Sequence, residues 1–291
     1  DRTELYELWW RQSFFDDKLV VRFGKTVPTF DFGNVVRPVP EQDISLRIPA
    51  VSGLLYTPVF VNPTMLGALP GYYNSAYGVT ATVAPTSRVY VSLGIYDGNS
   101  ARGEQTGLRA GPTFNAYRFE IGEIGTAWLL GPDHMPGAFA VGAWDQTGTL
   151  TLTTPQGPIT QDGTHGVYSF ASQRLWGETR DAGTRSVSGF VQFGANDSRT
   201  MIARTYIGLG LTAFGLIPGR PRDSVGGGLA WSWLNRNRGL RADEALLQFY
   251  DQIHVFGDVY LEPALTLAPT PGVKTAGQPA VAFTVQSTVL F

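Results

Sequence analysis

The chain has 291 residues, of which 43% are hydrophobic, 12% aromatic and only 16% charged. A disordered chain is rich in charge and poor in aromatic residues, and a coiled coil needs many Glu and Lys residues, so this composition excludes both classes. A formal net charge of −2 offers no basic surface to nucleic acid, and the lack of cysteine excludes disulfides, a thiol nucleophile and a Cys-based metal site.

Alternation of apolar and polar residues dominates the sequence, in runs of roughly ten residues that end at Gly, Pro, Asn or Asp. The runs predict thirteen strands, which are, in chain order, 5–15, 18–25, 76–84, 88–97, 117–129, 137–146, 166–176, 186–195, 201–214, 224–234, 244–255, 258–268 and 280–291. Tight turns alternate with long connections, the latter at 26–75, 98–116, 147–165 and 235–243. This pattern is typical of an antiparallel transmembrane β-barrel, whose tilted strands need about 9–11 residues to cross.

The two faces of each run differ in a way that favours lipid outside and water inside. In 88–97 one face is aliphatic and the other carries tyrosine, serine and glycine: Val89, Val91, Leu93 and Ile95 against Tyr90, Ser92, Gly94 and Tyr96. A small soluble barrel would fill its interior with Val, Ile and Leu instead. Amphipathic strands also occur in soluble sandwiches, so a soluble all-β glycan-binding protein stays as the alternative. Run length, the polar second face and the terminal Phe291 favour the membrane barrel.

Several segments are similar, in their order and spacing, to one known family. They are LYELWWRQSFF at 5–15, DDKLVVRFGK at 16–25, GVTATVAPTSRVYVSLGIYDGN at 78–99, GEIG at 122–125, VGAWDQTG at 141–148, GLIPGR at 215–220, YLEPALTLAPTPG at 260–272 and AVAFTVQSTVLF at 280–291. Together they resemble the carbohydrate-selective porin family (OprB-type) over essentially the whole chain. The resemblance implies a sixteen-stranded barrel in the bacterial outer membrane, and passive, substrate-biased diffusion of monosaccharides such as glucose, without a cofactor.

The strand count bears on how much of such a barrel is present. Thirteen is odd and short of sixteen, whereas bacterial single-chain barrels have even counts, so we expect a single porin domain over 1–291 that lacks about three N-terminal strands. A weaker alternative pairs part of 26–75 and closes a fourteen-stranded barrel. This segment carries seven prolines, too many for a central strand. It is interpreted either as a loop folded inward to constrict the pore or as one lying over the mouth.

Partners follow from the same resemblance. It implies contact with outer-membrane lipid and lipopolysaccharide, and the terminal Phe291 resembles the ending of proteins handled by the barrel-assembly machinery. A homo-oligomer is left open. A general diffusion porin whose solute is not a sugar is the second alternative for function.

Sugar hydroxyls are recognised by planar donors and acceptors, and apolar sugar faces stack on aromatic rings. The alternation predicts that such side chains line the pore at Glu7, Trp9, Arg11, Arg22, Arg118, Glu120, Trp144, Arg174, Gln192 and Gln286. Alternatives are a Glu7–Arg11 pair that only braces the wall, a lipid-interface position for Trp144 and simple hydration of the wall by the glutamines. Glu123 falls on the lipid face unless a bulge shifts the alternation.

An enzyme is not expected. The three histidines form no metal spacing, and no other metal site is predicted. Glu7 and Glu120 could be drawn as a glycosidase pair, but a water-filled lumen would not raise the pKa of an acid as that chemistry requires.

Overall fold

The computed structural model describes residues 5–28, 31–33, 58–65, 75–99, 113–177, 185–273 and 278–289. All thirteen predicted strands are present, in one antiparallel sheet whose spatial order is the chain order. They are β1 (Leu8–Phe14), β2 (Leu19–Thr26), β3 (Ala76–Thr86), β4 (Val89–Asp97), β5 (Arg118–Leu130), β6 (Met135–Thr154), β7 (Gly157–Gly177), β8 (Ser186–Asn196), β9 (Ala203–Phe214), β10 (Ser224–Leu234), β11 (Asp243–Phe256), β12 (Val259–Thr270) and β13 (Ala280–Val289). Two short 3₁₀ helices, η3 (Pro58–Phe60) and η5 (Arg236–Arg238), lie in connections.

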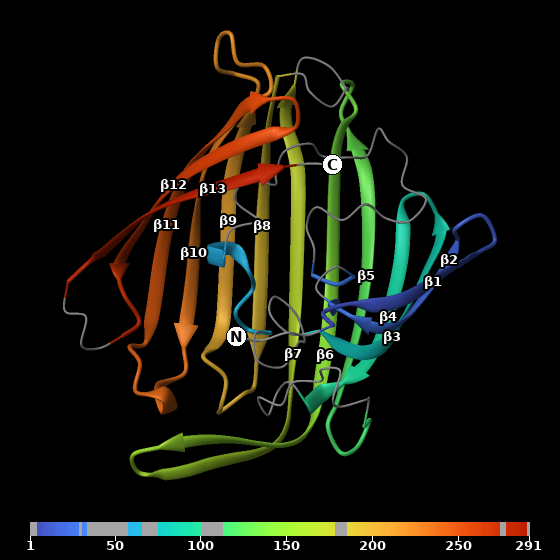
Figure 1. The fold of residues 1–291 in the computed structure, drawn as a ribbon, viewed down its shortest axis with the longest axis vertical. Coiled ribbons are helices and arrows are strands. Elements are labelled where there is room, and N and C mark those ends of the chain that lie inside the picture. The colour runs from blue at the N-terminus through green and yellow to red at the C-terminus, as the bar shows by residue number, and fades with distance from the viewer. Residues whose placement is uncertain are drawn as a thin grey trace.

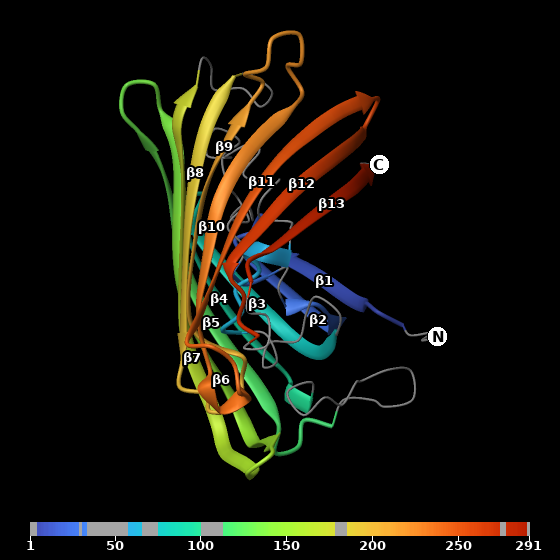
Figure 2. The same cartoon turned by 90° about the vertical axis from the view of Figure 1, so that its left-hand side faces the viewer.

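The sheet curls into a deep trough, with β1 and β13 on its two flanks (Figure 1). Figure 2 shows both flanks bent toward the same side, so that the sheet has a concave inner face and a convex outer face. Among the described residues the flanks do not pair with each other, and the described part of 26–75 contains η3 but no strand. The fourteen-stranded alternative therefore finds no support in that part. In the same described ranges, no helix has the length and apolarity to cross a membrane.

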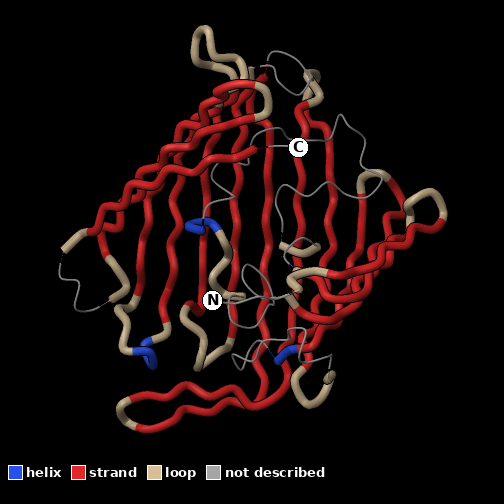
Figure 3. The backbone as a smooth tube through the Cα atoms, in the orientation of Figure 1, coloured by secondary structure: helices blue, strands red, loops and turns tan. Residues whose placement is uncertain are grey.

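The prediction of a long loop at 147–165 is wrong. Strands β6 and β7 continue through it as a hairpin that turns at 155–156, and Figure 3 shows this hairpin bending away from the line of the sheet. The alternation TLTLTT at 149–154 pairs with 157–162, and the Thr149 hydroxyl donates to Asp162 at 2.6 Å. Gly148 lies where the register shifts, so it marks an irregularity within the strand and not its end.

On β3 and β4 the apolar outer face is exposed and the inner face is buried, whereas on β13, at the edge of the sheet, both faces are exposed. On β4, Leu93 is 62% exposed on the outer face, whereas Tyr96 is fully buried on the inner face. Strand β13 shows Val281, Phe283 and Val285 on its outer face. It is described only as far as Val289, so the terminal Phe291 lies outside the described residues.

Glycines on the inner face have a packing role. Tyr90 lies opposite Gly125, and a Cβ atom added to that glycine would stand 2.2 Å from the tyrosine ring. Gly142 faces the ring of Tyr168 in the same way, with a corresponding distance of 2.3 Å. Aromatic rings therefore lie across the backbone of the neighbouring strand. The inner face is thus lined by rings and glycines together, and not by small polar residues alone.

Candidate functional site

Strands β1 to β4 place polar and aromatic side chains together on the inner face. Trp9 and Arg22 project there from β1 and β2, and the Arg22 guanidinium carbon lies 5.2 Å from the centroid of the Trp9 ring. Arg22 also pairs with Asp31, and the two side chains are only 13% and 10% exposed. The Asp31 carboxylate accepts a hydrogen bond from Thr80 at 3.2 Å, and Thr80 bonds to Tyr96. Because a mostly buried ion pair is costly to break, this chain of contacts holds Asp31 against the wall.

A buried carboxylate provides a second anchor for the same segment. Glu123 is 4% exposed and accepts hydrogen bonds from Tyr90 at 2.6 Å, Tyr168 at 2.8 Å and the backbone N–H of Gly33 at 2.7 Å. The tyrosines come from β4 and β7, on either side of β5 and β6. Residues 31–33 are therefore tied to the inner face at two separate points.

The predicted directions of three charged residues on β5 are wrong. Glu123 pairs with Ser92 in the ladder and points inward, without a bulge, while Arg118 and Glu120 lie on the outer face near the end of the strand. There Arg118 Nε is 3.4 Å from the Glu120 carboxylate. The cause is Phe119, which is apolar but packs on the inner face at 5.9 Å from the ring of Trp144. Apolar character at alternate positions of β5 therefore does not identify the lipid side.

The row predicted on β1 faces inward, and its charged side chains contact other partners than the Glu7–Arg11 pair that was the alternative interpretation. Glu7 accepts a hydrogen bond from the backbone N–H of Val27 at 3.2 Å. Arg11 lies opposite Arg22 and reaches Asp17 in the β1–β2 turn at 3.5 Å, with both of these side chains about half exposed. The described contacts thus give no Glu7–Arg11 pair.

The remaining predicted residues lie on the inner face. Trp144 is 3% exposed, which rules out a lipid-interface position for it. Arg174 and Gln192 are also buried, and the Tyr206 hydroxyl lies 3.5 Å from the Gln192 amide oxygen. Gln286 stands opposite Glu262 on the flank of the sheet.

A second part of the long connection, residues 58–65, packs on the inner face of β8 to β10, where Figures 1 and 2 both place it. Phe60 meets Phe190 edge to face, with ring centroids 5.4 Å apart, and Asn196 Nδ2 donates to the carbonyl of Thr64 at 2.7 Å. Gly194 and Gly228 make room for it, because added Cβ atoms would stand 2.3 Å from Thr64 and 2.6 Å from Phe60. Glycines inside strand patterns were the available signal for this close approach.

Sequence reasoning also missed a polar group on β9 to β12. Gln252 donates to Glu262 at 3.1 Å, and Tyr250 donates to Thr212 at 3.2 Å. Ser224 lies 3.3 Å from both the Gln252 amide oxygen and the Tyr250 hydroxyl. These residues alternate with outward apolar side chains, so the period-2 pattern of the same runs contained the signal.

Comparisons with known proteins agree with this architecture. The model of the family described as "Carbohydrate-selective porin, OprB family" matches residues 1–291. Porin B of Pseudomonas aeruginosa is 25% identical over 239 residues, which are 78% of this chain and 50% of that protein. The chain therefore spans about half the length of this curated relative.

Two solved structures share the fold. The high-pH structure of Pseudomonas putida OprB aligns with a TM-score of 0.80 and 19% identity, over 98% of this chain and 73% of that one. The low-pH structure of the same protein aligns with a TM-score of 0.62 and 18% identity, over 98% and 67% of the two chains. The family consists of porins and not of enzymes. Its match from end to end shows that this chain is an outer-membrane protein of the carbohydrate-selective porin, OprB family.

Proposed function

We propose that the chain forms the wall of an outer-membrane channel through which carbohydrates, and glucose-like monosaccharides in particular, diffuse passively. The observation that carries this proposal is the group formed by Trp9, Arg22 and Asp31 on the inner face. A planar guanidinium and a carboxylate match pairs of sugar hydroxyls, and an indole ring matches the apolar face of a sugar.

The group of Trp9, Arg22 and Asp31 is suited to weak contact with a passing sugar and not to tight binding. Trp9 remains 42% exposed although Arg22 holds its position, so a solute can reach the ring. Asp31 already accepts hydrogen bonds from the wall, which weakens its competition for a sugar hydroxyl. A conducting site must release its solute, so weak and partly satisfied contacts are what a channel requires.

We further propose that the connection 26–75 folds inward and narrows the pore. Two of its parts, 31–33 and 58–65, are bonded to the inner face on opposite sides of the trough, which supports this proposal. Residues 34–57 and 66–74 lie outside the described residues. Recognition of Phe291 by the assembly machinery and self-association stay predictions.

The proposed solute is tested with the full-length protein in planar bilayers and in liposomes. We expect glucose to enter liposomes faster than a neutral amino acid of similar size, and to reduce the ion current in a saturable manner. Equal entry of both solutes, with no block of the current, would be consistent with a channel but would contradict its selectivity for sugars. The general diffusion porin would then be the better description.

Trp9 provides a sharper test of the proposed contact. In Trp9→Ala, the glucose concentration that half-blocks the current should rise about fivefold, because about 1 kcal/mol of ring contact is lost. The small-ion conductance should stay equal or rise. Trp10→Ala is the matched control, since Trp10 is the adjacent indole on the outer face. Equal block of the current by glucose in the two variants would show that Trp9 does not contact the sugar.

A further inference from the structure

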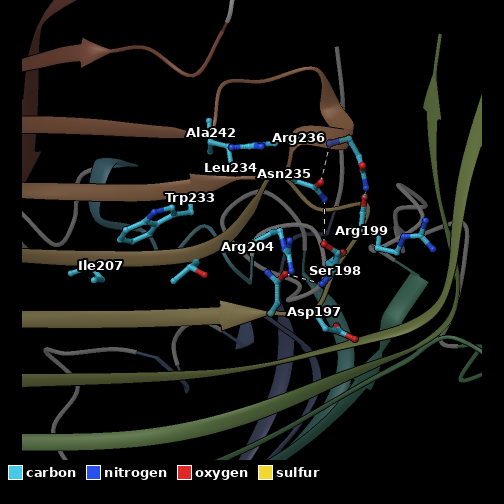
Figure 4. Close-up of a pocket in the computed structure, with 13 residues that line it drawn as sticks. Asp197, Ser198, Arg199, Arg204, Ile207, Trp233, Leu234, Asn235, Arg236 and Ala242 are labelled. Atoms are coloured by element: carbon cyan, nitrogen blue, oxygen red, sulfur yellow. Dashed lines mark hydrogen bonds between the residues drawn. The ribbon is translucent and has the colours of Figure 1, made fainter. Parts of the chain in front are cut away.

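A pocket of about 670 Å³ lies at one rim of the sheet, between the β8–β9 and β10–β11 connections (Figure 4). Three arginines from three parts of the chain line it: Arg199 in the first connection, Arg204 at the start of β9 and Arg236 in the second connection. We propose that this pocket binds a phosphate group of outer-leaflet lipopolysaccharide. The proposal rests on the outer-membrane location and not on the solute that the channel passes.

From the rim, the pocket extends onto the outer face of the sheet. Its strand-borne lining includes Ile207 and Trp233, and Trp233 stands opposite Thr205 in the ladder. The same alternation continues into Leu209 and Leu211, both well exposed on the outer face. A lipid bound here would therefore have its acyl chains against the apolar outer surface of β9.

The pocket also lies at the extracellular rim. Neighbouring strands are antiparallel, so the connections β8–β9 and β10–β11 share one rim with the long connections β2–β3 and β4–β5. Outer-membrane barrels carry their long connections outside the cell and their short turns in the periplasm. Lipopolysaccharide occupies the leaflet on that side, with its phosphates at the level of the headgroups.

In the described part of the chain, the three arginines at this pocket have no protein counter-ion. Within the described residues, no ion pair or side-chain hydrogen bond joins Arg199, Arg204 or Arg236 to another group. Asp197 also borders the pocket, but its carboxylate accepts from the Thr164 hydroxyl at 2.8 Å and from the backbone N–H of His165 at 2.9 Å. The pocket is thus left with a net positive charge, which suits a phosphate, because guanidinium groups bind phosphate through two parallel hydrogen bonds.

The backbone beneath the arginines is fixed in advance. Asn235 is buried and donates to the carbonyl of Ser198 at 3.2 Å, a bond that Figure 4 draws across the pocket. The N–H of Arg199 donates to Gln161 of the β6–β7 hairpin at 2.7 Å. Arg204 stands at a register shift, where Trp233 pairs with Thr205 and the next residue pairs with 203, so Arg204 has no ladder partner. Such bulges re-aim a side chain.

Aromatic residues complete the site. Trp231 and Trp233 stack on the outer face with ring centroids 4.6 Å apart, next to the arginines. Trp is enriched at membrane interfaces because its ring is apolar and its N–H is polar. From the rim toward the middle of the membrane, the outer face presents arginines, then the two indoles, then aliphatic side chains of β9. Phosphate, sugar and acyl chains follow one another in the same order in the proposed glycolipid.

The test compares the binding of phosphorylated lipid A with that of its dephosphorylated form. The full-length protein, in detergent with EDTA, is titrated with each lipid, and native mass spectrometry counts the bound molecules. We expect the phosphorylated lipid to bind at least about tenfold more tightly, because each arginine–phosphate contact is a charge-assisted hydrogen bond. The double variant Arg199→Gln/Arg204→Gln should lose most of this preference. Arg204→Lys, which keeps the charge without the planar fork, should retain part of it.

The matched control is Arg88→Gln/Arg222→Gln, which removes the same charge from exposed arginines at the opposite rim. An equal loss of preference in that control would mean that net charge and not the pocket binds the lipid, and would overturn the proposal. Inorganic phosphate binding as tightly as lipid A would identify a free anion as the occupant. A changed oligomeric state with unchanged lipid preference would identify a second copy of the chain. Each of these two results would also overturn the proposal.

Discussion

Replacing Glu123 with alanine is expected to lower the free energy of unfolding by about 3–5 kcal/mol and to raise the single-channel conductance. The substitution leaves the hydroxyls of Tyr90 and Tyr168 and the N–H of Gly33 without their acceptor in a buried place. Residues 31–33 then lose one of their two anchors, and the connection that we propose to narrow the pore can withdraw. Urea unfolding in lipid vesicles and bilayer recordings measure the two effects.

The control for this prediction lies three residues away. Glu120→Ala removes the same group from the outer face of the same strand, where it contacts Arg118 in a half-exposed pair. Exposed pairs contribute about 0–1 kcal/mol, so this variant should unfold nearly as the natural protein does. A larger loss from Glu120→Ala than from Glu123→Ala would contradict both the inward direction of Glu123 and its role as an anchor.

The variant Gly125→Val should be the most damaging single substitution of a glycine on β5, with a loss of about 3 kcal/mol or more. A Cβ atom there would stand 2.2 Å from a ring atom of Tyr90, which cannot move without leaving Glu123. The folded fraction, measured by the mobility of unheated protein in detergent gels, should fall in parallel. Gly122→Val is the control, because its nearest neighbour is the flexible end of Leu93 at 3.2 Å.

A double-mutant cycle separates the clash from any general intolerance of valine in the strand. In a Tyr90→Ala background the ring is absent, so the further cost of Gly125→Val should fall to less than half of its value in the natural protein. An unchanged cost would show that the ring is not the obstacle.

The strands were predictable because contact with lipid requires apolar side chains on the outer face wherever a strand crosses the membrane. Positions such as Leu93 and Phe283 are apolar wherever the chain crosses, so the alternation appears locally and needs no knowledge of distant residues. The hairpin at 149–162 was missed because the predicted strand ended at 146, where the register shifts, although the alternation resumes at Thr149.

The site was less predictable because its inner face is aromatic as well as polar. Because Phe119 points inward, the alternation on β5 does not tell which face is the lipid side. Arg118, Glu120 and Glu123 were therefore all assigned to the wrong face. The anchoring of Gly33 by Glu123 joins residues 90 positions apart, and no local pattern carries such a contact. The inward direction of Trp9 and Arg22 was predicted correctly because their strands alternate regularly between apolar and polar positions.

The rings that cross onto neighbouring glycines have a consequence for assembly. Hydrophobic alternation forbids a slip of one residue between strands but tolerates a slip of two, which keeps every side chain on its face. If β4 slid by two along β5, Tyr90 would meet Glu123 or Ala127 in place of Gly125, and only the glycine has space for the ring. Each ring and its glycine thus favour the native register when a strand pairs during assembly, and they disfavour the registers shifted by two residues in either direction.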